Sequence, residues 1–186
     1  SSHEIAQGYK EVEDESVFVK FKILKNQRSG AVSFADNVYI ISWTTTPWTL
    51  PGNVALAVGE KIDYVGVKVG GEIFILAEER VSKVLGENAQ ILFKLKGKDL
   101  VGLKYEPLFD VNSLKSAKSY QIYPADFVTT SDGSGVVHTA VMYGEDDYVL
   151  GEKLGLQKFH TVDEAGKIVS ELKEMAGDYD KSKATE

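Results

Sequence analysis

The stretch GSGVVHTAVMYGEDDY occupies residues 133–148 and carries turn, strand and helix signals in close succession. Its glycines predict sharp turns and close backbone approach, because glycine adopts conformations that other residues avoid. The valine pair predicts a short buried strand that delivers His138 to the rim of a sheet. Acids near the end of the stretch predict the start of a helix over residues 145–154.

Three consecutive acids, Glu145, Asp146 and Asp147, open this expected helix. Acids in a first turn complement the unpaired N–H groups and the positive end of the helix dipole, which explains the first two. Asp147 also shares a helical face with Leu150 and Leu154, which predicts that it points inward, although a second apolar face on the helix competes with that one. An inward carboxylate needs a cationic or hydrogen-bonding partner.

A second dense stretch is WTTTPWTLPGN, residues 43–53. The strand expected over residues 38–43 must end there, because proline cannot donate a backbone hydrogen bond. The threonines at 44–46 are either strand residues or a polar shelf beside the aromatic wall of Trp48. Such a shelf suits a ligand with hydroxyl, phosphate or ribose groups, and Asn53 adds an amide at the same rim. We expect the two stretches to face each other.

His138 has two interpretations from the residues alone. A lone histidine after two valines is more often a satisfied core or strand-end residue than a catalytic one. The neighbouring glycines and the strand end favour a functional role. The chain has no Gly-x-Ser-x-Gly elbow, phosphate-binding loop or dinucleotide-binding glycine motif. An enzyme of this sequence is therefore expected to use positioned water rather than a covalent nucleophile.

Composition excludes several classes of protein. A net charge of −7 with only two arginines argues against binding of long nucleic acid. The absence of cysteine removes disulfides and thiolate ligands, and three histidines argue against a histidine-rich zinc site. No apolar run reaches the roughly 20 residues of a membrane span, and no signal peptide is recognisable. We expect no metal, no membrane partner and a cytoplasmic location.

Strand signals dominate the rest of the chain. Apolar patterns predict strands at 17–23, 38–43, 53–58, 64–69, 72–76, 91–95, 120–123, 127–130 and 158–162. Helical spacing predicts helices at 77–85 and 145–154. We predict a single α+β domain over residues 1–186, strand-rich, with a barrel-like β core and a few peripheral helices. Residues 1–16 and 176–186 are expected to be polar entry and exit segments.

The two dense stretches closely resemble signature segments of the editing domain (CP1) inserted in isoleucyl-tRNA synthetases, which are class I aminoacyl-tRNA synthetases. The segments SSHEIAQGYKEVEDESVFVKF and HTVDEAGKI are also similar to that family, so the resemblance covers nearly the whole chain. It implies hydrolysis of valine mischarged on isoleucine tRNA, with valyl-adenylate as a further substrate. It implies no cofactor, and partners in the tRNA 3′ end and the rest of the synthetase in cis, joined through the entry and exit segments.

The resemblance also implies roles for individual residues. Asp147 resembles the acid that anchors the substrate's α-ammonium group. His138 resembles the residue that shapes the amino-acid pocket, excludes isoleucine and helps to position water. Asn53 matches an asparagine at the same rim. The segment that holds the terminal adenosine and the ester region corresponds to Thr44, Thr45, Thr46, Trp48 and Thr49.

Two local features qualify the resemblance. Many relatives have proline after the triplet His-Thr-Ala, whereas this chain has Val141, which removes a restraint on the loop. Valyl and leucyl relatives typically carry Arg-Pro where Thr46-Pro47 stands here, so Thr46 and Trp48 favour the isoleucine enzyme. The alternatives are a non-catalytic module that binds aminoacyl groups or tRNA ends, and an editing domain of a valyl or leucyl sister enzyme that acts on threonine or norvaline esters.

Overall fold

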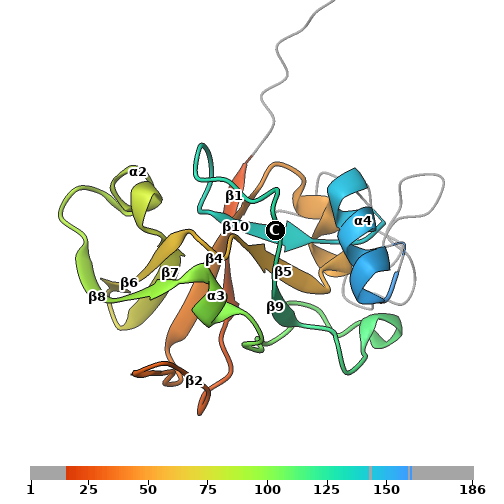
Figure 1. Cartoon of the computed structure of the whole chain (residues 1–186), viewed down its shortest axis with the longest axis horizontal. Helices are drawn as coiled ribbons and strands as arrows, with labels where there is room; N and C mark the ends of the chain where they lie inside the picture. The colour runs from red at the N-terminus through yellow and green to blue at the C-terminus, as the bar shows by residue number, and fades with distance from the viewer. Residues whose placement is uncertain (1–15, 143, 159, 161–186) are drawn as a thin grey trace, which may run out of the picture.

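The computed structural model, which describes residues 16–142, 144–158 and 160, is built mainly of β-strands (Figure 1). The larger sheet has five strands in the spatial order β1-β4-β7-β6-β8. Their bounds are β1 Val17–Lys22, β4 Val38–Thr44, β6 Asp63–Val69, β7 Glu72–Ala77 and β8 Gln90–Lys96. β4 and β7 run parallel, and the other neighbours run antiparallel. The strand that leads into the threonines therefore lies between two others.

A second sheet has three strands in the order β10-β5-β9. Their bounds are β5 Ala55–Val58, β9 Gln121–Pro124 and β10 Val136–Thr139. β10 pairs with β5 antiparallel, and β5 pairs with β9 parallel. Two short strands, β2 Arg28–Ser29 and β3 Val32–Ser33, pair separately. Among the described residues the strands are thus divided over three sheets and do not close into one barrel.

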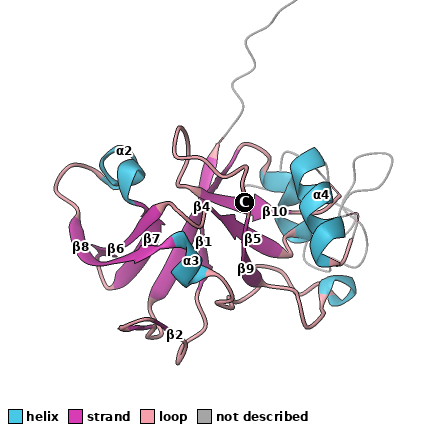
Figure 2. Cartoon of the chain, viewed as in Figure 1, coloured by secondary structure: helices cyan, strands magenta, loops and turns pink. Residues whose placement is uncertain are grey.

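Short helices lie at the periphery of these sheets (Figure 2). They are η1 Pro47–Gly52, η2 Glu78–Arg80, α2 Val81–Leu85, α3 Gly97–Leu100, η3 Asn112–Leu114 and α4 Glu145–Leu154. α4 lies beside the three-stranded sheet, at the opposite end of the molecule from β6 and β8 (Figure 1). It ends where Gly155 adopts the left-handed conformation, with φ +67°. Over residues 16–142, 144–158 and 160, no helix has the length and apolar character to cross a membrane.

Hydrogen bonds hold the start of β10 against the larger sheet. The Ser42 hydroxyl donates to the Val136 carbonyl at 2.8 Å, and the Ser134 hydroxyl donates to the Ile41 carbonyl at 2.7 Å. Gly135 makes the approach possible, because its φ is +76° and a Cβ there would lie 2.5 Å from the Cβ of Ala77. The two dense stretches of sequence are thereby brought side by side.

The main hydrophobic core combines residues of both larger sheets, and it includes Phe21, Leu56 and Tyr105, each at most 1 % exposed. Phe21 and Tyr105 meet edge-on with ring centroids 5.3 Å apart, and Tyr105 meets Tyr120 in the same way at 6.1 Å. Such pairs are favourable because the positive edge of one ring faces the negative face of the other. Tyr105 is therefore held rigidly at the centre of the domain.

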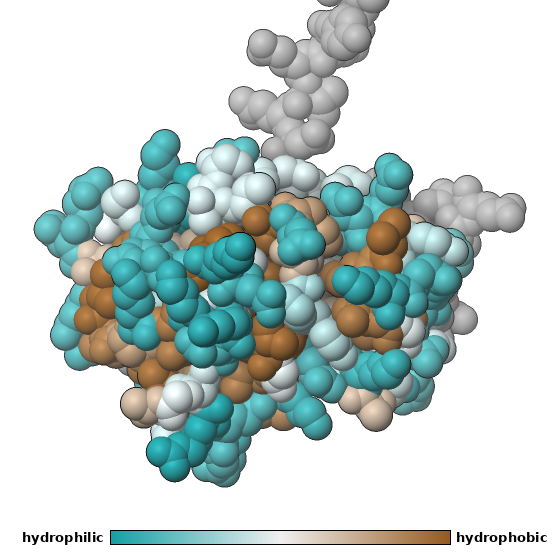
Figure 3. Space-filling model, viewed as in Figure 1, coloured by the Kyte–Doolittle hydropathy of each residue, from teal (hydrophilic) through white to brown (hydrophobic). Residues whose placement is uncertain are grey.

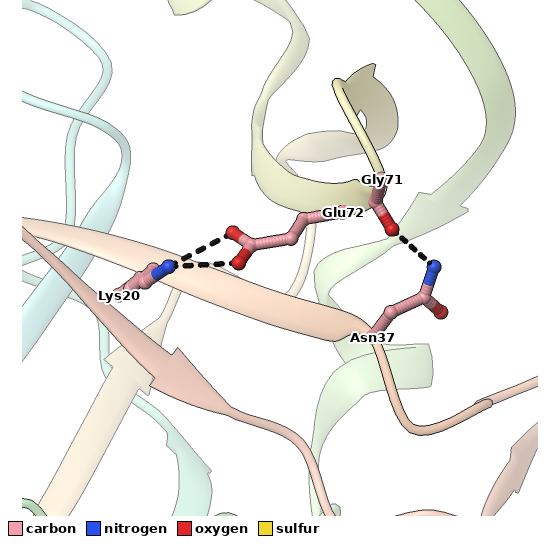
Figure 4. Close-up of polar contacts among 4 residues, drawn as sticks. All are labelled: Lys20, Asn37, Gly71 and Glu72. Atoms are coloured by element: carbon pink, nitrogen blue, oxygen red, sulfur yellow. Dashed lines mark hydrogen bonds and ion pairs between the residues drawn. The ribbon is translucent and has the colours of Figure 1, made fainter.

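Polar contacts cross the larger sheet on its surface. Lys20 on β1 donates to both carboxylate oxygens of Glu72 on β7 at 2.9 Å, and Asn37 donates to the Gly71 carbonyl at 2.8 Å (Figure 4). The Lys20 ammonium also lies 4.7 Å from the ring centroid of Tyr39. Exposed pairs of this kind contribute little to stability. In the view of Figure 3, polar residues cover much of the molecular surface, with hydrophobic residues visible between them.

Most sequence expectations for the fold are confirmed: the α+β strand-rich class, the helix at 145–154, and the strands from 17–23 to 120–123. The helix expected at 77–85 is confirmed in part, because Ala77 ends β7 and the α-helix α2 begins only at Val81, after the 3-10 helix η2. The strand expected at 127–130 is wrong. This segment is a loop whose Phe127 and Val128 pack with Ala57 and Leu150 in a small cluster, so its apolar residues reflect burial beneath a loop. Most of the strand expected at 158–162, and nearly all of the terminal segments 1–16 and 176–186, lie outside the described residues.

Candidate functional site

The two dense stretches line one cavity of about 290 Å³. The end of β4 and the helix η1 form one wall, and β10 with the first turn of α4 forms the other. The lining residues are Trp43, Thr44, Thr45, Thr46, Thr49, Val137, His138 and Asp147. The expectation that the stretches face each other is confirmed.

The threonine wall is held by its own hydrogen bonds. Pro47 takes the first position of η1, where its missing N–H costs nothing, and so the chain leaves the sheet after Thr44. The Thr46 N–H donates to the Thr44 hydroxyl at 3.0 Å, and the Thr49 hydroxyl donates to the Thr46 carbonyl at 2.8 Å. Thr44 and Thr49 are buried, whereas Thr45 is exposed. These contacts fix two hydroxyl groups at the cavity wall.

His138 is fixed at both ring nitrogens. Its Nε2 lies 2.9 Å from the Thr49 hydroxyl, and its Nδ1 lies 2.8 Å from the amide nitrogen of Asn53. The side chain is only 8 % exposed, and this burial lowers its pKa to about 4. The imidazole is therefore neutral near pH 7 and forms a rigid part of the wall.

Asp147 supplies a carboxylate from the first turn of α4. One of its oxygens accepts a hydrogen bond from the Ala140 N–H at 3.1 Å. Burial raises the pKa of Asp147 to about 6, against the opposing effect of that hydrogen bond. The group remains largely ionised near pH 7. Asp147 is the acidic side chain among the residues that line the cavity. Its negative charge attracts a cation to this end of the cavity.

Packing, rather than a proline ring, holds the loop between His138 and Asp147. Val141 is 2 % exposed and belongs to a cluster with Val54, Leu114 and Leu156. It also sits directly against α4, because a Cβ at Gly151 would come within 2.5 Å of a Val141 methyl group. The valine therefore anchors the helix that carries Asp147.

Some of the expected site residues line the cavity, and others do not. Six of the eight line the cavity, namely Thr44, Thr45, Thr46, Thr49, His138 and Asp147. Asn53 was expected at the same rim, but it is 4 % exposed and lies behind His138, which it contacts through Nδ1. Trp48 is half-buried on η1 and is not among the residues that line the cavity.

Sequence reasoning missed three contributors. Trp43 and Val137 line the cavity from positions that carry a strand pattern typical of core residues. Tyr105 donates its hydroxyl proton to the amide oxygen of Asn53 from a segment with no clear pattern. Strand alternation puts Val137 on the face opposite His138 and so does not identify it as a cavity residue, and no local signal identifies Tyr105.

The arrangement combines a carboxylate, ordered hydroxyls and a neutral imidazole around a small cavity. It can bind a ligand with an ammonium group at one end and hydroxyl groups at the other. Across the described portion of the chain, acidic and histidine side chains form no cluster of three that could hold a metal ion.

Curated relatives share close sequence similarity with this chain, although no family model matches it. It is 46 % identical over 169 residues, 91 % of its length, to the isoleucine–tRNA ligase of Clostridium tetani. It is 44 % identical over 179 residues, 96 % of its length, to isoleucine–tRNA ligase 2 of Bacillus cereus. The chain spans only about 15 % of the first relative's length and 16 % of the second's.

Solved structures share its fold at lower sequence identity. The crystal structure of GlLeuRS-CP1 matches 75 % of this chain and 60 % of its own, with a TM-score of 0.60 and 18 % identity. The editing domain of the cytosolic leucyl-tRNA synthetase of P. knowlesi matches 72 % of this chain and 60 % of its own, with a TM-score of 0.54 and 17 % identity. The fold is that of a synthetase editing domain.

Proposed function

This chain belongs to the isoleucine–tRNA ligase family and has the fold of a synthetase editing domain, and we propose that it hydrolyses the ester of valine mischarged on isoleucine tRNA. Valyl-adenylate is the second proposed substrate. The partners are then the 3′ end of the tRNA and the rest of the synthetase in cis, in the cytoplasm. The observation that supports the proposal most directly is Asp147, a half-buried carboxylate at the end of a small cavity.

In this proposal Asp147 binds the α-ammonium group of the aminoacyl ester. A cation stabilises a partly buried carboxylate more than an exposed one. The low local dielectric strengthens the attraction, and the cation offsets the cost of burying the negative charge. The same carboxylate already accepts the Ala140 N–H, which holds one of its oxygens in place. In this proposal the amino end of the substrate therefore lies at Asp147, in the cavity that His138 also lines.

The threonine wall binds the nucleoside end of the substrate. The ribose and ester oxygens need hydrogen-bonding groups, and the lining provides hydroxyls at Thr44, Thr45 and Thr46. Trp48 does not line the cavity, but it lies next to Thr49 on η1, and in this proposal its ring stacks on the adenine. The wall and the carboxylate together set the two ends of the ligand.

Hydrolysis then proceeds by attack of water on the ester carbonyl and cleavage of the bond to the ribose oxygen, which releases valine and the free 3′ end of the tRNA, with no covalent link to the protein. The ester is already activated, so a positioned water in a shaped cavity suffices. The domain complements a synthetic site whose selectivity is limited. One methylene group gives only about 1–3 kcal/mol of discrimination, a limit for which isoleucyl-tRNA synthetases are themselves the standard example.

A substrate panel tests the proposal. The chain is incubated separately with isoleucine tRNA charged with valine, isoleucine, threonine or norvaline, and release of the amino acid is followed. We expect fast release of valine and slow release of isoleucine. Preference for threonine or norvaline would assign the domain to a sister specificity. Binding of charged tRNA without release of any amino acid would identify a binding module and contradict the hydrolytic function.

A further inference from the structure

A chain of hydrogen bonds runs from the protein core to the cavity wall through His138. The Tyr105 hydroxyl donates to the amide oxygen of Asn53. The amide nitrogen of Asn53 lies 3.0 Å from the Ala55 carbonyl and 2.8 Å from Nδ1 of His138. All of these groups are buried. Each must therefore donate or accept with the partner in front of it.

The orientation of the Asn53 amide is determined from both ends. The Ala55 carbonyl can only accept, so the group that faces it must be the amide NH₂. Burial raises the pKa of the Tyr105 hydroxyl well above its usual value, so the hydroxyl keeps its proton and donates it to the amide oxygen. The second N–H of Asn53 then points at Nδ1 of His138. A ring nitrogen that accepts an N–H carries no proton of its own.

The proton of the neutral imidazole must then lie on Nε2. This nitrogen faces the Thr49 hydroxyl at 2.9 Å. The Thr49 hydroxyl lies 2.8 Å from the Thr46 carbonyl, which can only accept, so its own proton points there. Its oxygen is left to accept from Nε2–H. The direction of donation is thus consistent over the whole chain of groups.

We propose that Tyr105 and Asn53 lock His138 as the Nε2–H tautomer, so that His138 acts as a fixed wall and hydrogen-bond donor and takes no proton from the attacking water. The inference about the reaction rests on the proposed editing function, whereas the tautomer itself does not. In this tautomer the one basic lone pair of the ring, on Nδ1, accepts the Asn53 N–H, and Nε2–H donates to Thr49, so the ring presents no base to the cavity. Tyr105 is a positioning residue, because it acts on the cavity through Asn53.

The opposite tautomer would break several of these contacts. A proton on Nδ1 would require the Asn53 amide to turn over and place its oxygen against the Ala55 carbonyl. Two acceptors would then face each other in a buried site. Thr49 would have to donate to Nε2 and give up the Thr46 carbonyl. The geometry therefore favours one tautomer at two separate contacts, Asn53 with Ala55 and Thr49 with Thr46.

The tautomer can be observed directly in solution. Long-range ¹H–¹⁵N correlation spectra of the chain with ¹⁵N-labelled histidine identify which ring nitrogen carries the proton, and loss of the signals in His138→Gln assigns them. We expect a protonated Nε2 and an unprotonated Nδ1 in the wild-type chain. In Asn53→Asp a carboxylate that only accepts faces the ring, so Nδ1 should become protonated. A protonated Nδ1 in the wild-type chain, or an unprotonated one in Asn53→Asp, would overturn the proposal.

The role of Tyr105 is tested with a matched pair of variants. Tyr120 packs against Tyr105, and within the described residues its buried hydroxyl has no hydrogen-bond partner. Tyr105→Phe should produce a second set of His138 signals, because the Asn53 amide oxygen loses its donor. Tyr120→Phe should leave the His138 signals unchanged. Identical spectra for Tyr105→Phe and the wild-type chain would show that Tyr105 does not help to fix the tautomer of His138.

Deacylation rates provide the second readout. Tyr105→Phe should lower the ratio of valyl to isoleucyl ester hydrolysis by about five-fold, since loosening the wall admits the larger side chain. Tyr120→Phe should keep the wild-type ratio, and a ratio that falls equally in both variants would contradict a specific role. If the wild-type chain releases no amino acid, the editing function fails, whereas the spectra still decide the tautomer.

Discussion

The Nε2 atom of His138 and the hydroxyl oxygen of Thr49 lie 2.9 Å apart, although 89 positions separate the two residues in the sequence. This contact joins the strand β10 to the helix η1 and so links the two walls of the cavity. It exists because Gly135 lets β10 start against the larger sheet while Pro47 turns the chain out of it. The relation between these two elements determines the shape of the site.

Removing the charge of Asp147 should abolish recognition of the ammonium group. We expect Asp147→Asn to reduce deacylation of valyl-tRNA by about 100-fold, because loss of one partner leaves the substrate cation in a partly buried site without a counter-charge. Asp146→Asn is the matched control, since Asp146 is an exposed acid in the same turn of α4. Steady-state rates measure both. Equal activity in the two variants would exclude the ammonium role.

The same substitution should change stability in a pH-dependent way. Burial raises the pKa of Asp147 to about 6 from an unfolded value of 3.8, so the folded protein binds more protons than the unfolded one between these values. Ionisation of Asp147 therefore costs stability as the pH rises through this window. We expect Asp147→Asn to be more stable than wild type by about 1–3 kcal/mol at pH 7. Urea unfolding should show this gain shrinking to nothing as the pH falls to about 4.

A gain that stayed constant from pH 7 to pH 4 would contradict the raised pKa of Asp147. The contribution of His138 to stability changes with pH in the opposite direction. Burial lowers its pKa from 6.5 to about 4, so this contribution is lost as the pH falls from 6.5 to about 4. Comparing the variant with the wild-type chain at each pH cancels the contribution of His138.

Replacing His138 with alanine should weaken selectivity. The cavity gains the volume of the imidazole ring, so we expect the ratio of valyl to isoleucyl ester hydrolysis to fall about tenfold. Asn53 and Thr49 also lose their partner, and we expect a loss of stability of about 1–3 kcal/mol. The two effects are separated by measuring both esters at a temperature where the variant is folded. Unchanged selectivity would remove His138 from the wall that contacts the amino acid.

Gly135 should be sensitive to any side chain. Gly135→Ala places a Cβ 2.5 Å from the Cβ of Ala77 in a residue with φ +76°, so strain and overpacking add. We expect a loss of about 2–4 kcal/mol in the free energy of unfolding. Gly70→Ala is the matched control, because Gly70 has φ +59° and no heavy atom within 4 Å of a Cβ. It should cost only about 1–2 kcal/mol, the left-handed conformation alone. Similar losses in the two variants would show that the structure around Ala77 shifts to accept the added Cβ at little cost.

Local patterns in the sequence predicted the strands and helices well where side chains alternate between two environments. The strands at 64–69 and 72–76 follow from their apolar pattern, and the helix at 145–154 follows from the acids in its first turn. The pattern failed at 127–130, where the apolar residues Phe127 and Val128 are buried under a loop without pairing to a strand. A short apolar segment has the same sequence pattern whether it is a paired strand or a buried loop.

The sequence by itself determined the kinds of groups in the site: the hydroxyls at 44–46, the lone histidine and an inward acid on a helix. It did so because these residues lie in two short stretches with strong local signals. The tertiary structure decided which groups face the cavity and which stand behind it. Asn53 lies behind His138 and not at the rim where it was expected. Tyr105, from a segment without a clear pattern, contacts Asn53 there. Hydrogen-bond direction and tautomer depend on contacts between residues 50 to 90 positions apart, and no local pattern encodes such contacts.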